Sequence, residues 1–131
     1  MTQPPKSSTF YERMGGDSGV KKLVSAYMRI LQCDPQATEL LKCYERISLE
    51  RYETRLGEFL SGWLGGPALY QSNHGMPMLR ESHRSIRISR SLMIAWVGCM
   101  QKALEETVED PALRLHLAGR FTRMAESLVN A

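Results

Sequence analysis

Two of the chain's three histidines lie close together in the stretch "HGMPMLRESH", which begins at His74 and ends at His83. Neutral imidazole is the commonest metal ligand among protein side chains. A zinc site needs three or four protein ligands, but no other Cys or His stands between these histidines, and Glu81 is the only acid there. An iron porphyrin needs a single axial imidazole, because the macrocycle supplies the other nitrogens. One of these histidines could therefore hold haem, and the alternative is an imidazole that is simply packed or hydrogen bonded.

Other catalytic motifs are missing from the sequence. It contains no glycine-rich phosphate loop, no HExxH pair, no DxDxDG loop and no Ser-His-Asp set in a supporting context. Hydrolytic and nucleotide-dependent activities therefore have no candidate residues. No flavin or nicotinamide site is visible in so short a chain, so turnover at an iron would need an external electron donor, and a reductase is a candidate partner.

The elements that must position the histidines follow a helical hydrophobic period. Asp34, Ser48 and Ser89 are placed to cap helices, and Pro35 and Pro111 stand at first helical positions. No segment alternates like a strand and no repeat is present, so the sequence predicts an all-α protein. Between residues 67 and 88 the period fades. The predicted helices cover 17–34, 35–44, 48–63, 89–108 and 111–128, with at most a short helical turn at 77–82.

Composition favours one compact domain outside membranes. With 131 residues and 43% hydrophobic content, residues 10–131 can form a single core, whereas the polar, proline-containing residues 1–9 predict a flexible tail. The opening lacks the pattern expected of a signal peptide, and no apolar run approaches the length of a membrane helix. Cys33, Cys43 and Cys99 lack a CxxC spacing, which favours small buried thiols in a reducing cytoplasm.

A cluster of arginines offers a different class of function. Arg80, Arg84, Arg87 and Arg90 recur at steps of three or four, so a helix there would carry them as one basic stripe. Such a stripe could bind nucleic-acid phosphates, but it could equally be a solvated surface. The formal charge of +3 is too small to argue for nucleic acid by itself, and no helix-turn-helix signature or stacking aromatics support it.

Several spaced motifs together resemble the truncated haemoglobins, particularly their second group. These are "YERMGGDSG", "LSGWLGGPALY", "HGMPMLRESH" and "AWVGCM", over residues 10 to about 108. The resemblance implies a truncated globin fold, a two-over-two helical sandwich around haem, as iron protoporphyrin IX. It implies that His83 is the proximal iron ligand and that His74 lies nearer the haem edge. Arg55, Tyr70 or His74 are then expected to pair with the haem propionates, and Leu79 to contact the haem.

The resemblance also implies a distal pocket, which is built from Met28, Tyr27, Tyr44, Tyr52, Leu56 and Trp96. Trp96 matches the tryptophan whose indole N–H points at the bound ligand, and Tyr44 matches an aromatic residue at the end of the short helix. Such donors stabilise a ligand that takes negative charge, as dioxygen does on ferrous haem. Ordinary core packing at helical spacing is the alternative explanation for these residues.

One pair departs from the family pattern. The family's second helix usually carries a Phe-Tyr pair whose hydroxyl reaches the ligand, and the sequence matches it with Tyr27 and Met28. A thioether is therefore expected in place of the hydroxyl, with faster release of oxygen. Alternatives are that the Met28 sulfur ligates the iron as a sixth ligand, or that it fills a gap in the core.

The sequence thus predicts a haem protein that reversibly binds dioxygen, nitric oxide or carbon monoxide. A haem enzyme that detoxifies nitric oxide or reduces peroxide is the first alternative. A haem-free helical module that binds nucleic acid through the Arg80–Arg90 stripe is the second. The expected partners are a diatomic gas and a reductase, and the expected assembly is a monomer or a weak homodimer.

Overall fold

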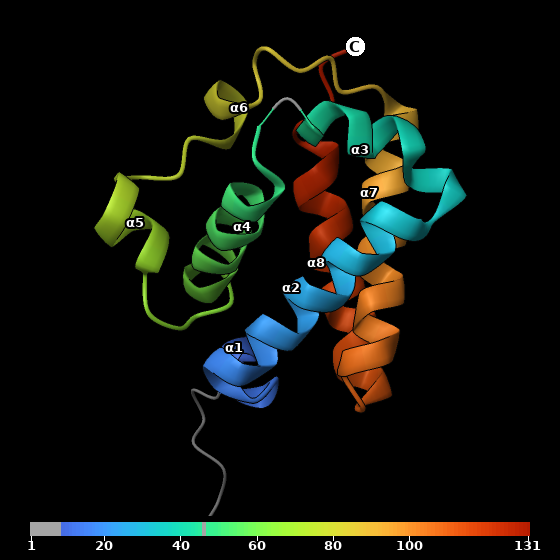
Figure 1. The fold of residues 1–131 in the computed structure, drawn as a ribbon. Coiled ribbons are helices and arrows are strands. Elements are labelled where there is room, and N and C mark those ends of the chain that lie inside the picture. The colour runs from blue at the N-terminus through green and yellow to red at the C-terminus, as the bar shows by residue number, and fades with distance from the viewer. Residues whose placement is uncertain (1–8, 46) are drawn as a thin grey trace, which may run out of the picture.

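The computed structural model describes residues 9–45 and 47–131, and within them it is built from helices without strands (Figure 1). This confirms the all-α prediction. Residues 1–8 of the predicted tail lie outside the described residues. The long helices are α2 (Gly16–Cys33), α4 (Leu49–Trp63), α7 (Arg90–Thr107) and α8 (Pro111–Glu126). The short elements are α1 (Phe10–Arg13), η1 (Pro35–Ala37), α3 (Thr38–Glu45), α5 (Leu69–His74) and α6 (Leu79–Ser82).

The helices α4, α7 and α8 begin where the sequence predicts, because their first turns are capped by local side chains. Ser48 Oγ accepts a hydrogen bond from Arg51 N at 3.2 Å, and Ser89 Oγ accepts one from Leu92 N at 3.2 Å. The Asp110 carboxylate accepts from the first turn of α8, in which Pro111 is the first residue. Each cap accepts a hydrogen bond from a backbone N–H that the start of a helix leaves unpaired, and contributes about 0.5–2 kcal/mol to the stability of the fold.

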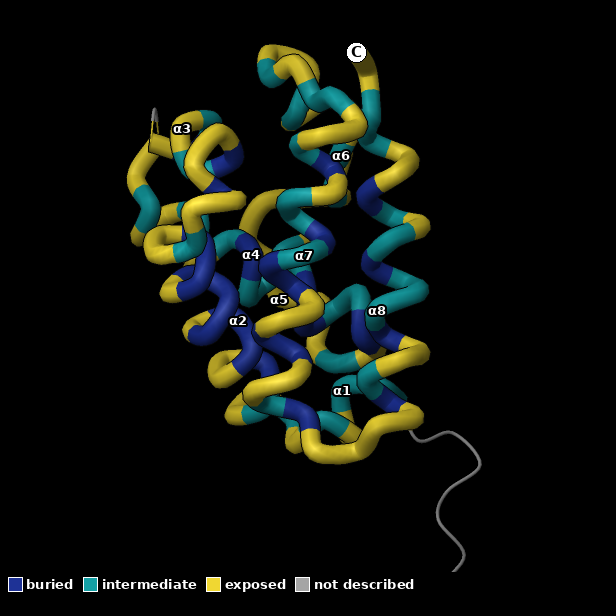
Figure 2. Tube along the Cα trace, turned by 90° about the vertical axis from the view of Figure 1, so that its right-hand side faces the viewer, coloured by how far each residue is buried: buried dark blue, intermediate teal, exposed yellow. Residues whose placement is uncertain are grey.

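The core lies between two pairs of helices. α2 packs against α4, α7 packs against α8, and α2 also packs across α7. Figure 2 shows buried residues along α2 and on the inner sides of α7 and α8, whereas α5 and α6 contain none. The largest fully buried side chains are Leu23, Tyr27, Leu31, Leu60, Leu64, Met100, Leu104, Leu113, Leu117 and Phe121. Among the described residues, no helix has both the length and the apolar character needed to cross a bilayer.

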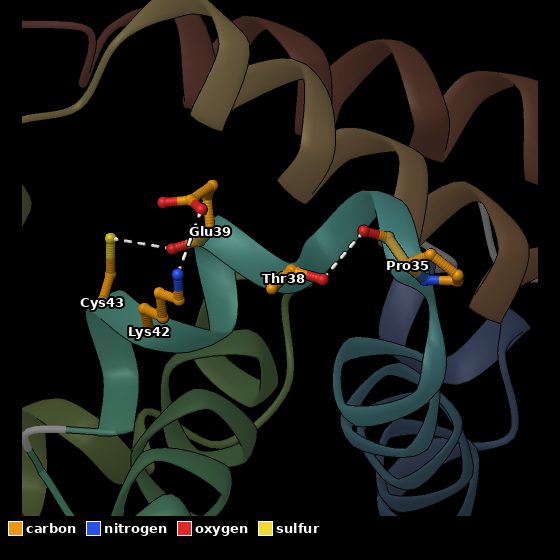
Figure 3. Close-up of polar contacts among 5 residues, drawn as sticks. All are labelled: Pro35, Thr38, Glu39, Lys42 and Cys43. Atoms are coloured by element: carbon orange, nitrogen blue, oxygen red, sulfur yellow. Dashed lines mark hydrogen bonds and ion pairs between the residues drawn. The ribbon is translucent and has the colours of Figure 1, made fainter.

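Short-range hydrogen bonds hold the segment that links α2 to α4. Asp34 Oδ1 accepts from Gln36 N at 2.9 Å and so caps η1. Thr38 Oγ1 donates to Pro35 O at 2.9 Å, and Cys43 Sγ lies 3.5 Å from Glu39 O, to which it donates (Figure 3). These contacts continue the chain directly into α3, whose buried residues include Tyr44.

Two short helices were not predicted from the sequence. α1 and α5 span four and six residues, too few turns to leave a hydrophobic period. α1 is tied to the end of α4, because Tyr11 N donates to Leu64 O at 2.9 Å. A Cβ at Gly66 would lie 2.5 Å from the Tyr11 ring, so this close approach requires glycine. The motif "LGG" therefore serves helix packing.

Two further expectations differ from the structure. Residues 83–89 are not helical, so Arg80 in α6, Arg84 and Arg87 in this segment, and Arg90 at the start of α7 do not share one helix face. The predicted basic stripe required one continuous helix, and the chain does not form that helix here. The region from residue 67 to residue 88 contains glycine and proline residues and supports only short helices such as α6. Of the three cysteines, Cys99 is buried, Cys43 is partly buried and Cys33 is exposed, so one alone is a core residue.

Candidate functional site

A cavity of about 470 Å³ lies among α3, α4, α7, α8 and the segment from α6 to α7. This volume falls in the range of small-molecule and cofactor sites, which are usually apolar with a few polar groups. The predicted site residues that line it are Tyr44, Tyr52, Arg55, Leu56, Tyr70, Leu79, His83 and Trp96. Tyr27, Met28 and His74 are outside the lining. One cavity thus brings together most of the residues that sequence motifs singled out.

The protonation of the His83 ring follows from its hydrogen bonds. His83 Nδ1 lies 2.7 Å from Leu79 O and 3.1 Å from Ser82 Oγ. A carbonyl oxygen can only accept, so Nδ1 carries the proton and donates it, and in the neutral ring Nε2 then keeps a free lone pair. Metal-binding histidines are held in this way by a second partner on the other nitrogen. His83 follows α6 directly and is partly buried.

His83 has no companion ligands for a bare metal ion. Within the described part of the chain, no three side chains of His, Cys, Asp or Glu come together as a metal site. A structural zinc requires several protein ligands, and the described residues around His83 do not supply them. A porphyrin iron requires one imidazole and an apolar slot, and the cavity provides both.

The segment that follows His83 is anchored by a residue that the sequence did not single out. Asn130 Oδ1 accepts from Ile88 N at 2.7 Å, and Asn130 Nδ2 donates to Ile86 O at 3.0 Å. Ile86 and Ile88 both line the cavity. Asn130 therefore holds this wall against the C-terminus. An amide far along the chain gives no local pattern that would predict such a role.

The polar side of the cavity lies on α4 and α5. Arg51 and Arg55, one turn apart on α4, both line the cavity, as does Tyr70 of α5. Arg51 was missed, although its spacing of four from Arg55 could have indicated a shared face. Arginine donors and a tyrosine hydroxyl suit the carboxylates of a bound ligand.

His74 is tied to α4. Its Nε2 lies 3.0 Å from Glu58 Oε1, and its ring centroid lies 4.9 Å from that of Tyr70. Glu58 accepts hydrogen bonds from Asn73 and from His74. These bonds hold the pKa of its carboxyl below the usual value, and the bond from Asn73 has the larger effect. The short helix α5 is thereby fastened to α4, and His74 supports the cavity from outside.

A polar network centred on Tyr52 also borders the cavity. The hydroxyl oxygens of Tyr27 and Tyr52 are 2.7 Å apart, and Trp96 Nε1 donates to Tyr52 Oη at 3.4 Å. The rings of Tyr44 and Tyr52 are stacked, with centroids 3.9 Å apart and planes 10° apart. Residues from α2, α3, α4 and α7 meet here, so the network exists only in the folded chain.

Met28 occupies a different place from the one expected. Its side chain is buried in the core and does not line the cavity, whereas the hydroxyl of Tyr27 reaches the network. Neighbouring residues on a helix point in directions about 100° apart. A comparison with the family pattern that is shifted by one position therefore assigns the wrong side chain of the pair to the site. A hydroxyl is therefore present, and the buried Met28 side chain agrees with the alternative that it fills a gap in the core.

The tyrosine network predicts a loss of stability in alkali. Burial raises the pKa of Tyr27 and of Tyr52. Repulsion from a Tyr44 tyrosinate raises the pKa of Tyr27 further, and repulsion from a Tyr27 tyrosinate raises that of Tyr52 further. In the unfolded chain these groups ionise near pH 10. Below that pH both states are protonated and these groups add no pH dependence, whereas above it the unfolded state ionises first. We expect the free energy of unfolding to fall as the pH rises beyond about 10, and urea titrations across this range to show a shallower fall in Tyr27→Phe. An equal fall in that variant would contradict the prediction.

Comparison with known proteins places the chain in a family. Residues 9–130 match the family model described as bacterial-like globin. The chain is 32% identical over 120 residues to the group 2 truncated hemoglobin YjbI of Bacillus subtilis, which covers 92% of this chain and 87% of that protein.

Solved structures agree with this match. The cold-adapted truncated hemoglobin of the Antarctic marine bacterium Pseudoalteromonas haloplanktis superposes with a TM-score of 0.91 at 36% identity, covering 95% of this chain and 99% of that one. The truncated oxygen-avid haemoglobin of Bacillus subtilis superposes with a TM-score of 0.82 at 31% identity, covering 94% and 100% of the two chains. The predicted truncated globin fold is thus confirmed, and the chain belongs to the bacterial-like globins, a family of haem proteins.

Proposed function

We propose that the chain holds iron protoporphyrin IX in the cavity and reversibly binds a diatomic gas, with dioxygen the first ligand to test. The observation that carries the proposal is the 2.7 Å hydrogen bond between His83 Nδ1 and Leu79 O, which leaves Nε2 as a ligand on the cavity wall. The truncated haemoglobin of Bacillus subtilis that resembles this chain is described as oxygen-avid, which favours dioxygen.

The residues around the cavity have separate tasks in this proposal. Bound haem supplies an iron centre at which a diatomic gas can bind. The apolar lining, including Leu56 and Leu79, buries the macrocycle and excludes water. Arg51, Arg55 and Tyr70 can pair with its carboxylates. The hydroxyl and indole donors of the network around Tyr52 stabilise negative charge that develops on a ligand.

Hemin titration of the apoprotein, followed by gas exchange, tests this function. We expect an intense porphyrin absorption band that saturates at one haem per chain. After reduction, dioxygen and then argon should shift the spectrum back and forth over repeated cycles. Binding without saturation, or immediate irreversible oxidation in every cycle, would contradict reversible oxygen binding. Catalytic loss of nitric oxide or peroxide with an added reductant would instead favour the enzymatic alternative.

The proposal extends to the protein's surroundings. The three cysteines are free, which favours a reducing compartment such as the cytoplasm. A separate reductase would keep the iron ferrous. A monomer or weak homodimer remains our expectation for the assembly.

A further inference from the structure

We propose that Asn130 is a latch that keeps haem in the cavity. It fastens the His83 wall, which we define as residues 79–88, to the C-terminal end of α8, and the cavity opens when this wall moves away. Asn130 is thus a positioning residue, which acts on the iron ligand through the wall. The inference rests on the proposed function, because it presupposes haem in the cavity.

The His83 wall is the thin side of the cavity. Its side chains point alternately to the two sides of the segment: Arg80, Arg84 and Arg87 are exposed. The residues between them line the cavity, and these are Leu79, Ser82, His83, Ser85, Ile86 and Ile88. A single segment of chain therefore separates the cavity from solvent here, whereas α4, α7 and α8 on the other sides belong to the packed core.

Little else in the fold holds this wall in place. The helix α6 contains no buried residue, and residues 83–89 are not helical. Within the described chain, α6 packs extensively against no other helix. Segments with few buried contacts open locally at a lower free energy than the core does. The His83 wall is therefore the side of the cavity that we expect to open first.

Asn130 makes three hydrogen bonds to the wall. Its backbone N donates to Ile88 O at 2.9 Å, and its side-chain Oδ1 accepts from Ile88 N at 2.7 Å. Its Nδ2 donates to Ile86 O at 3.0 Å. Among the described residues, no other hydrogen bond joins residues 79–88 to a distant part of the chain. Figure 1 shows the C-terminus beside the segment between α6 and α7.

The chain just before Asn130 is itself anchored. Val129 packs against a small core cluster of α7 and α8, which consists of Met93, Val97 and Ala125. Leu128 lines the cavity. The latch therefore stands on helices that belong to the core, so its three bonds tie a weakly held segment to a firmly held one.

A chain of hydrogen bonds leads from the latch to the iron ligand. Asn130 Nδ2 donates to Ile86 O, Ile86 N donates to His83 O at 3.0 Å, and His83 Nδ1 donates to Leu79 O at 2.7 Å. Partners behind a metal ligand fix its orientation and contribute to metal affinity. Loss of the latch should therefore loosen the imidazole as well as the wall.

Haem transfer from the loaded protein to excess apomyoglobin tests the latch. Asn130→Ala removes both side-chain bonds, and we expect it to lose haem about ten-fold faster than the parent. Ser127→Ala is the matched control, because its hydroxyl donates to Met124 O and not to the wall, and it should behave like the parent. An unchanged rate in Asn130→Ala, or an equal acceleration in Ser127→Ala, would overturn the inference.

Trypsin reports opening of the wall without reference to haem, because Arg84 and Arg87 are exposed cleavage sites within it. We expect both the loaded protein and the apoprotein of Asn130→Ala to be cut there several-fold faster than the parent, since cleavage follows local opening. Cleavage inside α2 should stay as slow as in the parent, and the urea midpoint should hardly move. Equal acceleration at all sites would indicate a general loss of stability and would overturn the latch.

The iron–histidine stretching frequency of the ferrous, gas-free protein tests the positioning of His83. Asn130→Asp keeps an acceptor for Ile88 N but has no N–H for Ile86 O, so its frequency should shift as it does in Asn130→Ala. The parent's frequency in both variants would overturn this role. If the parent takes up no haem, the proposed function fails, and the trypsin pattern of the apoprotein still decides whether Asn130 holds the wall. Normal haem loading with unchanged haem loss in Asn130→Ala would overturn this inference alone.

Discussion

Replacing His83 by glycine is expected to abolish tight haem binding, and added imidazole is expected to restore the iron ligation. Among the described residues, the variant removes the one imidazole that lines the cavity, and its Nε2 is free to bind metal. Loss of the hydrogen-bond partner behind a metal-binding side chain typically weakens metal binding by roughly 10–100-fold, so loss of the ligand itself should cost more. Small added imidazole can then enter the space that the side chain leaves.

Hemin titration followed by absorption measures this effect, with the remaining histidines as comparisons. His116 lies on α8, exposed and with its ring 5.0 Å from that of Phe10, so His116→Ala should bind haem like the parent. His74→Ala separates the two histidines of the motif. An intact ligation spectrum in His83→Gly, or its loss in His74→Ala instead, would identify a ligand other than His83.

The features that the sequence predicted well are those with local causes. Ser48 and Ser89 cap the helices that follow them, and Pro111 begins α8, because each signal acts within one turn of the chain. The position of His83 after a short helical turn also follows from a compact motif. Helix lengths and the all-helical class depend on the same local information.

The features that the sequence did not predict depend on tertiary contacts or on exact register. Tyr27 and Met28 are neighbours in α2, and a shift of one residue decides which of them meets Tyr52. Asn130 and Glu58 act on segments 42 and 16 residues away in sequence. Periodicity carries no information about such partners, so these roles required the structure.

Gly19→Ala is expected to destabilise the fold by about 2–3 kcal/mol, although alanine is the better helix former. A Cβ at Gly19 would lie 2.1 Å from Met14 O and 2.7 Å from Met14 C. Both atoms are backbone, so α1 and the turn into α2 would have to move. That movement would also disturb the contact of α1 with the end of α4, where Tyr11 N donates to Leu64 O.

Gly57→Ala is the matched control, because Gly57 lies inside α4 and a Cβ there meets nothing within 4 Å. Here the helix propensity of alanine acts alone, and we expect a gain of about 0.5–1 kcal/mol. Urea denaturation of both variants measures the two effects with one probe, and a shift of the midpoint at constant slope reports stability. Opposite signs for the same substitution would show that the backbone of Met14 requires glycine at position 19. A gain in both variants would mean that α1 does not pack on α2 as closely as the structure has it.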